Sequence, residues 1–426
     1  MIVRIIWISI FAVCSIQLSQ GQKVKASKFG FDKVNSTKYL LEAVWSNYDT
    51  IIIDKQESDW YVEPIVIKNL SDKVIYIEAG VEIKALPEKF KGLHDELIRF
   101  ENVSNVKLIG SRTKFLMNKA EYTHGEWRHA LSLRKCKNIV IRGLELRNSG
   151  GDGIYISGLE KGSFSENILI ENVISDNNRR QGISLISVQN LIVRNSEFTK
   201  TNGTLPEAGL DIEPNHPDNR IVNVTFENCI FSENNHSGIK IALHNLNSAS
   251  IPVSILFDNC MLRSNHHPEN PQAHSEISIG ANKKDPVKGH VLFEECFIES
   301  SNWGILHSRK RSDAFEVRFK DCFAENICKM QTMPPFALEV PDYYRNSGSL
   351  GGIDFGDFYV SYSVPLPVFN IRGSKMQTLR LEDVKGKIIL DSNQIIQSYI
   401  DYIQYEPSFN VNVDLEFIEN ALIKKE

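Results

Sequence analysis

Short runs of alternating apolar and polar residues, separated by Asn and Gly, recur along most of this chain. One series begins with Gly followed by apolar-x-apolar, at residues 153–156, 182–185, 209–212 and 238–241; it continues with Gly-Ile-Leu-His at 304–307, and a degenerate member lies at 276–279. A second series begins with Asn and lies between them, at residues 138–143, 167–172, 190–195 and 223–228, and more weakly at 255–259 and 291–295. A period of two predicts strands, and a repeat length mostly in the high twenties is typical of a solenoid. The pattern therefore predicts an all-β, single-stranded parallel β-helix, in which equivalent positions of successive rungs lie about 4.8 Å apart.

The ends of the repeat region predict two caps. Asn35, Ser36 and Thr37 precede an amphipathic run at residues 38–45, and this order is typical of a helix start. We expect residues 22–48 to form an N-terminal cap with this short helix, because the open end of a solenoid exposes unpaired strand edges. The parallel β-helix is predicted over residues 49–395, and residues 396–426 are expected to form a C-terminal cap.

The first 21 residues read as a secretory signal. Arg4 precedes an apolar core at residues 5–16, and the small residues Ser19 and Gly21 frame a cleavage site. We therefore expect a secreted or periplasmic protein after cleavage near Gly21. The apolar core is too short to span a bilayer, and no other stretch predicts a membrane span. A formal net charge of −5 with both signs well mixed argues against a nucleic-acid partner, which would require a basic face.

Two further ladders are predicted from repeated positions. Cys229, Cys260, Cys296 and Cys322 each follow the turn that ends a strand, so they are expected to stack inside the solenoid as free thiols. The rung spacing also lies within the range that a disulfide tolerates, so pairing stays open. Asn residues repeat at one turn position, and stacked amides can form hydrogen bonds from rung to rung. They are Asn172, Asn195, Asn228 and Asn259.

These repeats resemble the right-handed parallel β-helix superfamily that holds pectate lyases, polygalacturonases and related polysaccharide-active proteins. The resemblance covers nearly the whole mature chain, including the N-terminal capping helix. It implies the handedness of the fold and a link to carbohydrate, and it does not choose a reaction, because the fold also carries non-enzymatic adhesins. The Asn-Thr-Asp, Asp-Asp and Gly-His-Gly signatures of polygalacturonases are absent from the sequence as such.

One outward face of the predicted solenoid gathers candidate catalytic groups. Aligning the Gly-led strands gives an outward column of Ser132, Tyr155, Ser184, Asp211, Lys240, Ser278 and Leu306. Asp211 and Glu213 lie at i and i+2 on this face, with Cα atoms about 6.6 Å apart. Two carboxyl groups held so close have different pKa values, and one acid beside one carboxylate is what glycoside hydrolysis requires. Asp152, about two rungs from Asp211, is the third catalytic candidate, although it follows two glycines and its alternative role is to shape a turn.

Residues around this pair are candidates for holding substrate. Arg180 is suited to bind a carboxylate or sulfate, Lys240 lies one rung beyond Asp211, and aromatic rings can stack on sugars. For the stretch from Glu126 to His129 a salt-bridged loop is the alternative, and His129 alone fits a structural role. The substrate-binding candidates are Arg180, Gln181, Lys240, Tyr155, Trp127, Arg128, His129 and His236.

Three functions stay open at this stage. The first is a secreted glycoside hydrolase that acts on an acidic or otherwise decorated polysaccharide, needs no cofactor or metal and works as a monomer. The second is a polysaccharide lyase or uronate epimerase, in which Asp211 and Glu213 hold Ca²⁺ while Lys240 and Arg180 carry the chemistry. The third is a carbohydrate-binding β-helix without chemistry.

Overall fold

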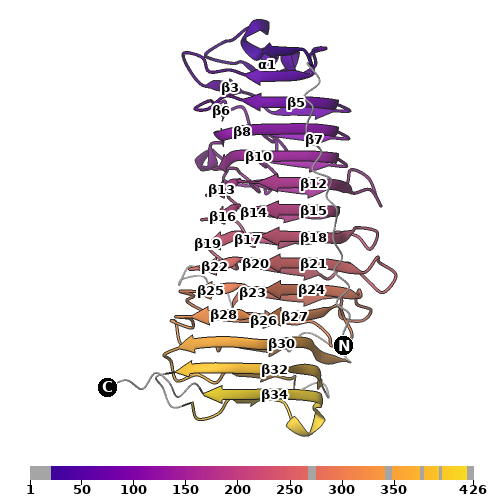
Figure 1. Ribbon diagram of the computed structural model, residues 1–426, viewed down its shortest axis with the longest axis vertical. Coiled ribbons are helices and arrows are strands. Elements are labelled where there is room, and N and C mark those ends of the chain that lie inside the picture. The colour runs from indigo at the N-terminus through magenta and orange to yellow at the C-terminus, as the bar shows by residue number, and fades with distance from the viewer. Residues whose placement is uncertain (1–20, 267–274, 341–347, 375–378, 393–395, 420–426) are drawn as a thin grey trace, which may run out of the picture.

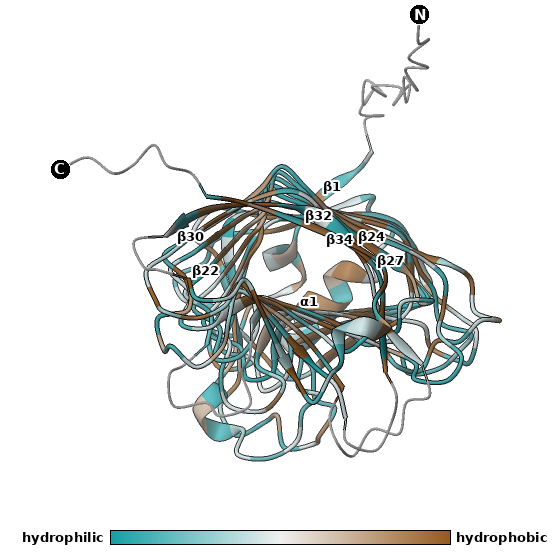
Figure 2. Cartoon of the chain, turned by 90° about the horizontal axis from the view of Figure 1, so that it is seen from below, coloured by the Kyte–Doolittle hydropathy of each residue, from teal (hydrophilic) through white to brown (hydrophobic). Residues whose placement is uncertain are grey.

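The chain folds into one long stack of parallel strands (Figure 1). The computed structural model describes residues 21–266, 275–340, 348–374, 379–392 and 396–419. The signal segment predicted at residues 1–21 lies almost wholly outside these ranges. Each turn of the solenoid contributes strands to three stacks, which form the sides of the cross-section seen in Figure 2.

The first stack runs the full length of the solenoid. Its strands are β1 (Lys23–Lys25), β2 (Thr50–Ile53), β5 (Ser71–Ile77), β8 (Ser104–Leu116), β10 (Lys137–Arg147), β12 (Ser165–Glu171), β15 (Val188–Arg194), β18 (Ile221–Glu227), β21 (Val253–Asp258), β24 (Gly289–Glu294), β27 (Glu316–Lys320), β30 (Ser349–Tyr362), β32 (Arg380–Ser392) and β34 (Val411–Glu419).

The second stack adjoins the first through the long strands β8, β10, β30, β32 and β34, which contribute to both, so the two form one 22-stranded sheet. Its own strands are β3 (Trp60–Val62), β6 (Glu82–Ala85), β13 (Ile174–Asp176), β16 (Glu197–Thr199), β19 (Ile230–Ser232), β22 (Met261–Arg263), β25 (Phe297–Glu299) and β28 (Cys322–Glu325).

The third stack is a separate 12-stranded sheet. Its strands are β4 (Ile65–Lys68), β7 (Ile98–Glu101), β9 (Leu131–Arg134), β11 (Ile154–Ser157), β14 (Gln181–Leu185), β17 (Ala208–Ile212), β20 (Ile239–Leu243), β23 (Ser275–Ala281), β26 (Gly304–Ser308), β29 (Phe336–Glu339), β31 (Phe369–Arg372) and β33 (Ile400–Ile403).

The ends of the solenoid differ. Helix α1 (Thr37–Val44) lies at the N-terminal end and buries Leu40, Ala43 and Val44 against the core, as the sequence predicts for a cap. At the other end, β33 and β34 pair with β31 and β32. Residues 400–419 therefore continue the solenoid, whereas the sequence predicts a separate cap from residue 396. Short 3₁₀ helices lie at Ala26–Phe29, Lys119–Glu121 and Pro407–Phe409.

Like side chains stack inside the solenoid because every rung repeats the same inward positions. Phe257 is fully buried, and its ring centroid lies 5.4 Å from that of Phe226 and 4.7 Å from that of Phe293. The predicted cysteine ladder is confirmed: all six described cysteines are buried and free, and Cys260 Sγ donates to the Phe226 carbonyl at 3.4 Å. Interior packing of this kind creates the fixed register that positions the outward side chains.

Asparagine ladders join the rungs at the turns. The Nδ2 groups of Asn138, Asn167, Asn190 and Asn223 each donate to the side chain of the preceding rung at 2.8–2.9 Å. These residues have φ between 54° and 58°, a left-handed conformation that Asn adopts more readily than other residues with a side chain. At the turn position predicted from sequence, Asn259 donates to Asn228 at 2.6 Å.

Candidate functional site

The candidate catalytic column lies on the outer face of the third stack, as predicted. The register aligns Tyr155 with Ser132 and Ser184, Ser184 with Asp211, and Asp211 with Lys240. The expected last member, Leu306, is wrong, because Ser278 aligns with His307. Leu306 aligns with Ile277 and is buried in the core. The column is therefore continuous from Ser132 to Ser278 and continues with a histidine.

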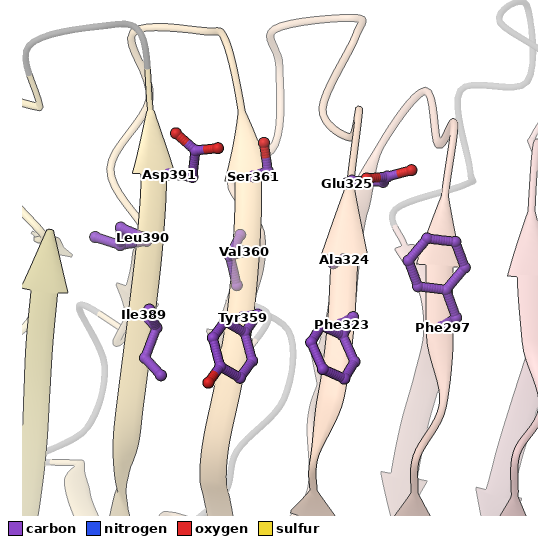
Figure 3. Close-up of a pocket in the computed structure, with 10 residues that line it drawn as sticks. All are labelled: Phe297, Phe323, Ala324, Glu325, Tyr359, Val360, Ser361, Ile389, Leu390 and Asp391. Atoms are coloured by element: carbon purple, nitrogen blue, oxygen red, sulfur yellow. The ribbon is translucent and has the colours of Figure 1, made fainter. Parts of the chain in front are cut away.

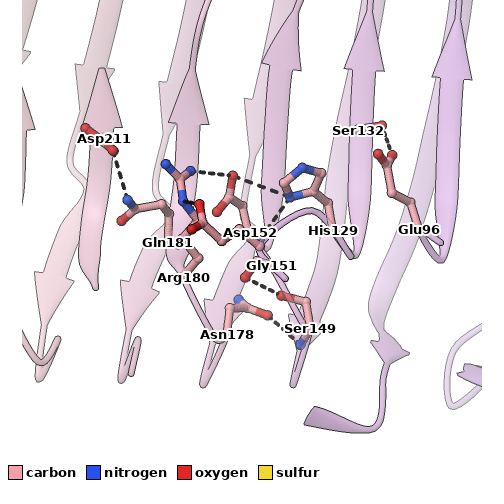
Figure 4. A network of polar contacts seen from close by, with 12 residues as sticks. Glu96, His129, Ser132, Ser149, Gly151, Asp152, Asn178, Arg180, Gln181 and Asp211 are labelled. Carbon is pink, nitrogen blue, oxygen red and sulfur yellow. Dashed lines mark hydrogen bonds and ion pairs between the residues drawn. The ribbon is translucent and has the colours of Figure 1, made fainter. Parts of the chain in front are cut away.

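Arg180 lies at the centre of a group of carboxylates (Figure 4). Its guanidinium nitrogens lie 3.3 Å from Glu126 Oε2, 3.6 Å from Asp152 Oδ2 and 3.2 Å from Glu213 Oε2. Burial acts to lower the pKa of Arg180, but the surrounding carboxylates, including Asp211, outweigh it and raise that pKa. Arg180 therefore holds the acidic side chains of the site together, and its own side chain is only 13% exposed.

Asp152 is fully buried at the turn before β11. Its backbone N–H donates to His129 Nδ1 at 3.0 Å, and its Oδ2 lies 3.4 Å from the same ring nitrogen. Among the described residues, neither carboxyl oxygen of Asp152 accepts a hydrogen bond. Burial raises the pKa of Asp152 to about 7, although the charge of Arg180 acts in the opposite direction. Asp152 therefore retains a proton in mildly acidic solution.

Asp211 is also fully buried, on β17. Gln181 Nε2 donates to Asp211 Oδ2 at 2.9 Å, and Gln181 Oε1 accepts the backbone N–H of Ala208 at 2.8 Å. Burial raises the pKa of Asp211 to about 6; Lys240 opposes this shift and Glu213 adds to it. The predicted pair thus consists of a buried acid, Asp211, beside a carboxylate, Glu213, whose side chain is 37% exposed.

Tyr155 and His129 form one stacked unit beside the carboxylates. Their ring centroids lie 4.5 Å apart with planes 9° from parallel, and the Arg134 guanidinium lies 4.8 Å from the centroid of the Tyr155 ring. Burial lowers the pKa of His129 well below its ordinary value, so the ring is neutral. Because Nδ1 accepts the Asp152 N–H, the proton of His129 is assigned to Nε2.

Glu96 is a buried carboxylate that sequence reasoning missed. It accepts the Ser132 hydroxyl and lies 3.1 Å from an Arg99 nitrogen and 2.5 Å from an Arg134 nitrogen. Glu96 lies just before β7, where the repeat is weak, and only the outward positions of Arg99 and Arg134 on adjacent rungs signal that an acid is required there.

The remaining candidates lie at or beyond the edge of the site. Lys240 is half-buried, and the described structure shows no ion pair or hydrogen bond for its Nζ. Trp127 is 39% exposed and stacks on His94, with centroids 5.0 Å apart. His236 Nδ1 lies 3.0 Å from Ser237 Oγ.

Arg128 lies outside the site. Its guanidinium is buried and donates to the backbone carbonyls of Phe90, Lys91 and His124. It therefore fixes the surrounding loops, and the expectation that it contacts substrate does not agree with this placement.

The described residues contain neither a candidate metal site nor a candidate membrane helix. In that part of the chain, no group of three or more His, Cys, Asp or Glu side chains converges in a way that could hold a metal ion. Asp211 and Glu213, the two acids that would hold Ca²⁺ in a lyase, are therefore not part of such a group. No helix within the described ranges is both long and apolar enough to cross a membrane.

Comparison with known proteins identifies the fold. The family model for the right-handed β-helix region matches residues 97–268. No curated protein matches the chain. Among solved structures, the Streptococcus pneumoniae surface protein and adhesin PfbA is 11% identical with a TM-score of 0.57, covering 93% of this chain and 99% of that one.

Two further solved structures show the same likeness. The pre-mature bacteriophage phi29 gene product 12 is 14% identical with a TM-score of 0.56, covering 92% of this chain and 56% of that one. The Yersinia enterocolitica family 28 exopolygalacturonase is 11% identical with a TM-score of 0.51, covering 93% and 78%. At such identities the likeness is one of fold, and it extends over nearly the whole chain.

Proposed function

We propose that this chain, which has the fold of a right-handed parallel β-helix, is an exported glycoside hydrolase acting on an acidic polysaccharide. The observation that carries this proposal is the pair formed by Asp211 and Glu213. One is a buried carboxyl whose pKa is raised to about 6, and the other is a partly exposed carboxylate that forms an ion pair with Arg180. Paired carboxyl groups in unlike environments perform acid and base catalysis in glycoside hydrolysis.

The environments of the two groups assign their roles. Asp211 donates its proton to the glycosidic oxygen of the leaving group. Glu213 either takes a proton from the attacking water or attacks the anomeric carbon itself, and the stereochemistry of the first product distinguishes these routes. Because Asp211 is fully buried in the unliganded protein, the side chains that cover it must move apart when substrate binds.

The surrounding residues support this pair. Arg180 positions Glu213 and Asp152, and Asp152 serves as an auxiliary acid beneath it. Lys240 is the cation best placed to contact an acidic group of the substrate, because Arg180 already lies against three carboxylates. Gln181 fixes the orientation of Asp211.

A second candidate function is a lyase or epimerase. The specific observation in its favour is Lys240, which is aligned with Asp211 and forms no ion pair with any residue that the structure describes. In that reaction Lys240 would remove the proton α to a uronate carboxylate, and Asp211 and Glu213 would hold a Ca²⁺ that would supply positive charge to the carboxylate. A lyase leaves an unsaturated product, whereas a hydrolase does not.

The test follows two signals from the same reactions. Purified mature protein is incubated with plant, algal and animal polysaccharides, with added calcium or with EDTA. The hydrolase predicts new reducing ends without the ultraviolet absorbance of an unsaturated uronate, in both conditions. Both signals together, lost in EDTA, identify the lyase. The absence of both with every glycan contradicts the hydrolase and the lyase, and leaves a uronate epimerase, which produces neither signal, or a β-helix that binds glycan without chemistry.

Export is a separate part of the proposal and rests on residues 1–21. It predicts that protein recovered outside the cytoplasm begins near Gln22. N-terminal sequencing of that fraction checks it, and an intact Met1 in the exported protein contradicts it.

A further inference from the structure

A stripe of apolar side chains runs along the outer face of the second stack, away from the candidate catalytic site. Consecutive rungs align these residues directly, so their side chains point to solvent one above another. The apolar stripe consists of Met261, Phe297, Phe323, Tyr359, Ile389 and Ile418. Its five steps of about 4.8 Å give a length of about 24 Å.

The centre of the apolar stripe is the most exposed part. Phe323 is 43% exposed and Tyr359 is 40% exposed. Figure 3 shows their rings side by side with Phe297 and Ile389, along a shallow pocket that these residues line. Solvent-exposed rings aligned over several rungs are uncommon on a soluble sheet, and such patches mark interaction sites.

An aliphatic column on the first stack provides an internal comparison. It is equally regular, but each of its members is half-buried. The neighbouring column includes Glu171, which forms ion pairs with Arg142 at 2.5 Å and with Arg194 at 2.6 Å. The aliphatic column consists of Val140, Leu169, Ile192, Thr225, Leu256 and Leu292. Both columns stack apolar side chains, so stacking alone does not distinguish the apolar stripe from the aliphatic column. The exposure of its central rings and the residues at its borders do.

The apolar stripe is bordered by carboxylates on both sides. Glu295, Asp321 and Asp357 lie two residues before Phe297, Phe323 and Tyr359, and Glu325 and Asp391 lie two residues after Phe323 and Ile389. In the described structure none of these five acids forms an ion pair. Each border also holds one basic residue: Lys387 follows Asp357 in the first, and Arg263, which lies 3.7 Å from Glu299, stands in the second. The borders together carry a clear negative excess.

The orientation of the rings argues against sugar as the occupant. The centroids of Phe323 and Tyr359 lie 4.8 Å apart with planes 10° from parallel. One face of each ring is therefore partly covered by the other ring, which leaves less open ring face for a sugar to stack on. A second copy of this chain is also disfavoured, because two such surfaces would bring acidic borders against acidic borders.

We propose that the apolar stripe docks an extended segment of another polypeptide, with apolar side chains flanked by lysine or arginine. Three outward columns about 6.6 Å apart and about 24 Å long offer roughly 300 Å², well below the roughly 800 Å² that each partner buries in a stable complex. The contact is therefore weak, transient and sensitive to salt.

The test uses a random dodecapeptide library displayed on phage and selected on the purified full-length protein. Selected peptides are synthesised with a fluorophore, and their Kd is measured by anisotropy. We expect apolar sequences rich in Lys or Arg that bind in the micromolar range and weaken at high salt. Binding should weaken at least tenfold with E325K and with the F323S/Y359S double variant, and should change less than twofold with L256S in the aliphatic column. Each variant is first matched to the wild type by its Tm.

Four results would overturn this proposal. They are the absence of any enriched peptide, enriched peptides without basic residues, equal binding by the F323S/Y359S variant, and glycan binding or dimerisation that the same variant abolishes. Hydrolysis of polysaccharide does not enter the test, so the two proposals can fail independently.

Discussion

Replacing Arg180 with glutamine removes a guanidinium that lies within 3.6 Å of three carboxylates. Glutamine retains the size and polarity of the side chain without its charge. The carboxylates that lose most are Asp152 and Asp211, which are fully buried, whereas Glu126 and Glu213 remain in contact with water.

The structure sets the expected magnitude. At 3.6 Å and an effective dielectric constant of about 20, the attraction between Arg180 and Asp152 is roughly 4 to 5 kcal/mol. Removing one partner of a buried pair typically costs about 3 to 5 kcal/mol, because the other charge stays buried. Protons can replace the guanidinium at low pH, since the pKa values of Asp152 and Asp211 are already raised. We therefore expect a loss of about 3 to 5 kcal/mol near pH 8 that becomes smaller toward pH 5.

Urea unfolding of R180Q and wild type at both pH values measures this loss. The matched control is R194Q, because Arg194 pairs with Glu171 on the outer face of the first stack and its side chain is 40% exposed. That variant should lose at most about 1 kcal/mol at either pH. Equal losses for the two variants near pH 8, or a loss for R180Q that grows toward pH 5, would refute the argument that Arg180 compensates buried charge.

Three other predictions follow from the same structure. The folded protein keeps a proton on Asp152 up to about pH 7, while the unfolded chain loses it near pH 4, so this group makes stability fall as pH rises between those values. D152N should therefore reduce the fall of Tm with pH. An unchanged dependence of Tm on pH in D152N would contradict the raised pKa of Asp152. N167A removes two hydrogen bonds of the asparagine ladder and places alanine at a φ of 57°, so it should lower the free energy of unfolding in urea by about 2 kcal/mol. N167G loses the same hydrogen bonds but relieves the backbone strain, so it should lower that free energy by about half as much. F257A leaves a cavity between Phe226 and Phe293 and should cost about 3 to 5 kcal/mol by the same measurement, with F323A on the exposed stripe costing less than half of that.

The sequence predicts the parallel β-helix because the residues that set the register between strands repeat along the chain. Alternating Ile, Leu and Val, with Asn or Gly at the turns, places the strands and aligns Tyr155, Ser184, Asp211 and Lys240 correctly. The error at Leu306 has a single cause. Gly304 aligns with Ser275, one position earlier than the other Gly-led strands, and a slip of one residue exchanges the inward and outward faces.

The parts of the site that lie outside the repeat are not predictable in this way. Glu96 and Arg128 lie in irregular turns, where no repeating sequence pattern indicates which way a side chain points. The sequence also identifies Arg180 as a substrate contact, because it cannot show that Glu126, Asp152 and Glu213 approach it together. Contacts among side chains from different turns depend on the folded loops, and the pattern of a single strand does not encode them.

The central claim is that Asp211 and Glu213 carry out glycoside hydrolysis. Its most direct test is kcat/KM for D211N and E213Q, measured by reducing ends on the best polysaccharide of the panel. E126Q is the matched control, because Glu126 contacts Arg180 from the opposite side and its side chain is 42% exposed. Loss of a catalytic carboxyl should lower kcat/KM by at least about a hundredfold in D211N and E213Q, with E126Q within about tenfold of wild type. Activity retained in D211N or E213Q, in protein that is folded by its Tm, would contradict the claim.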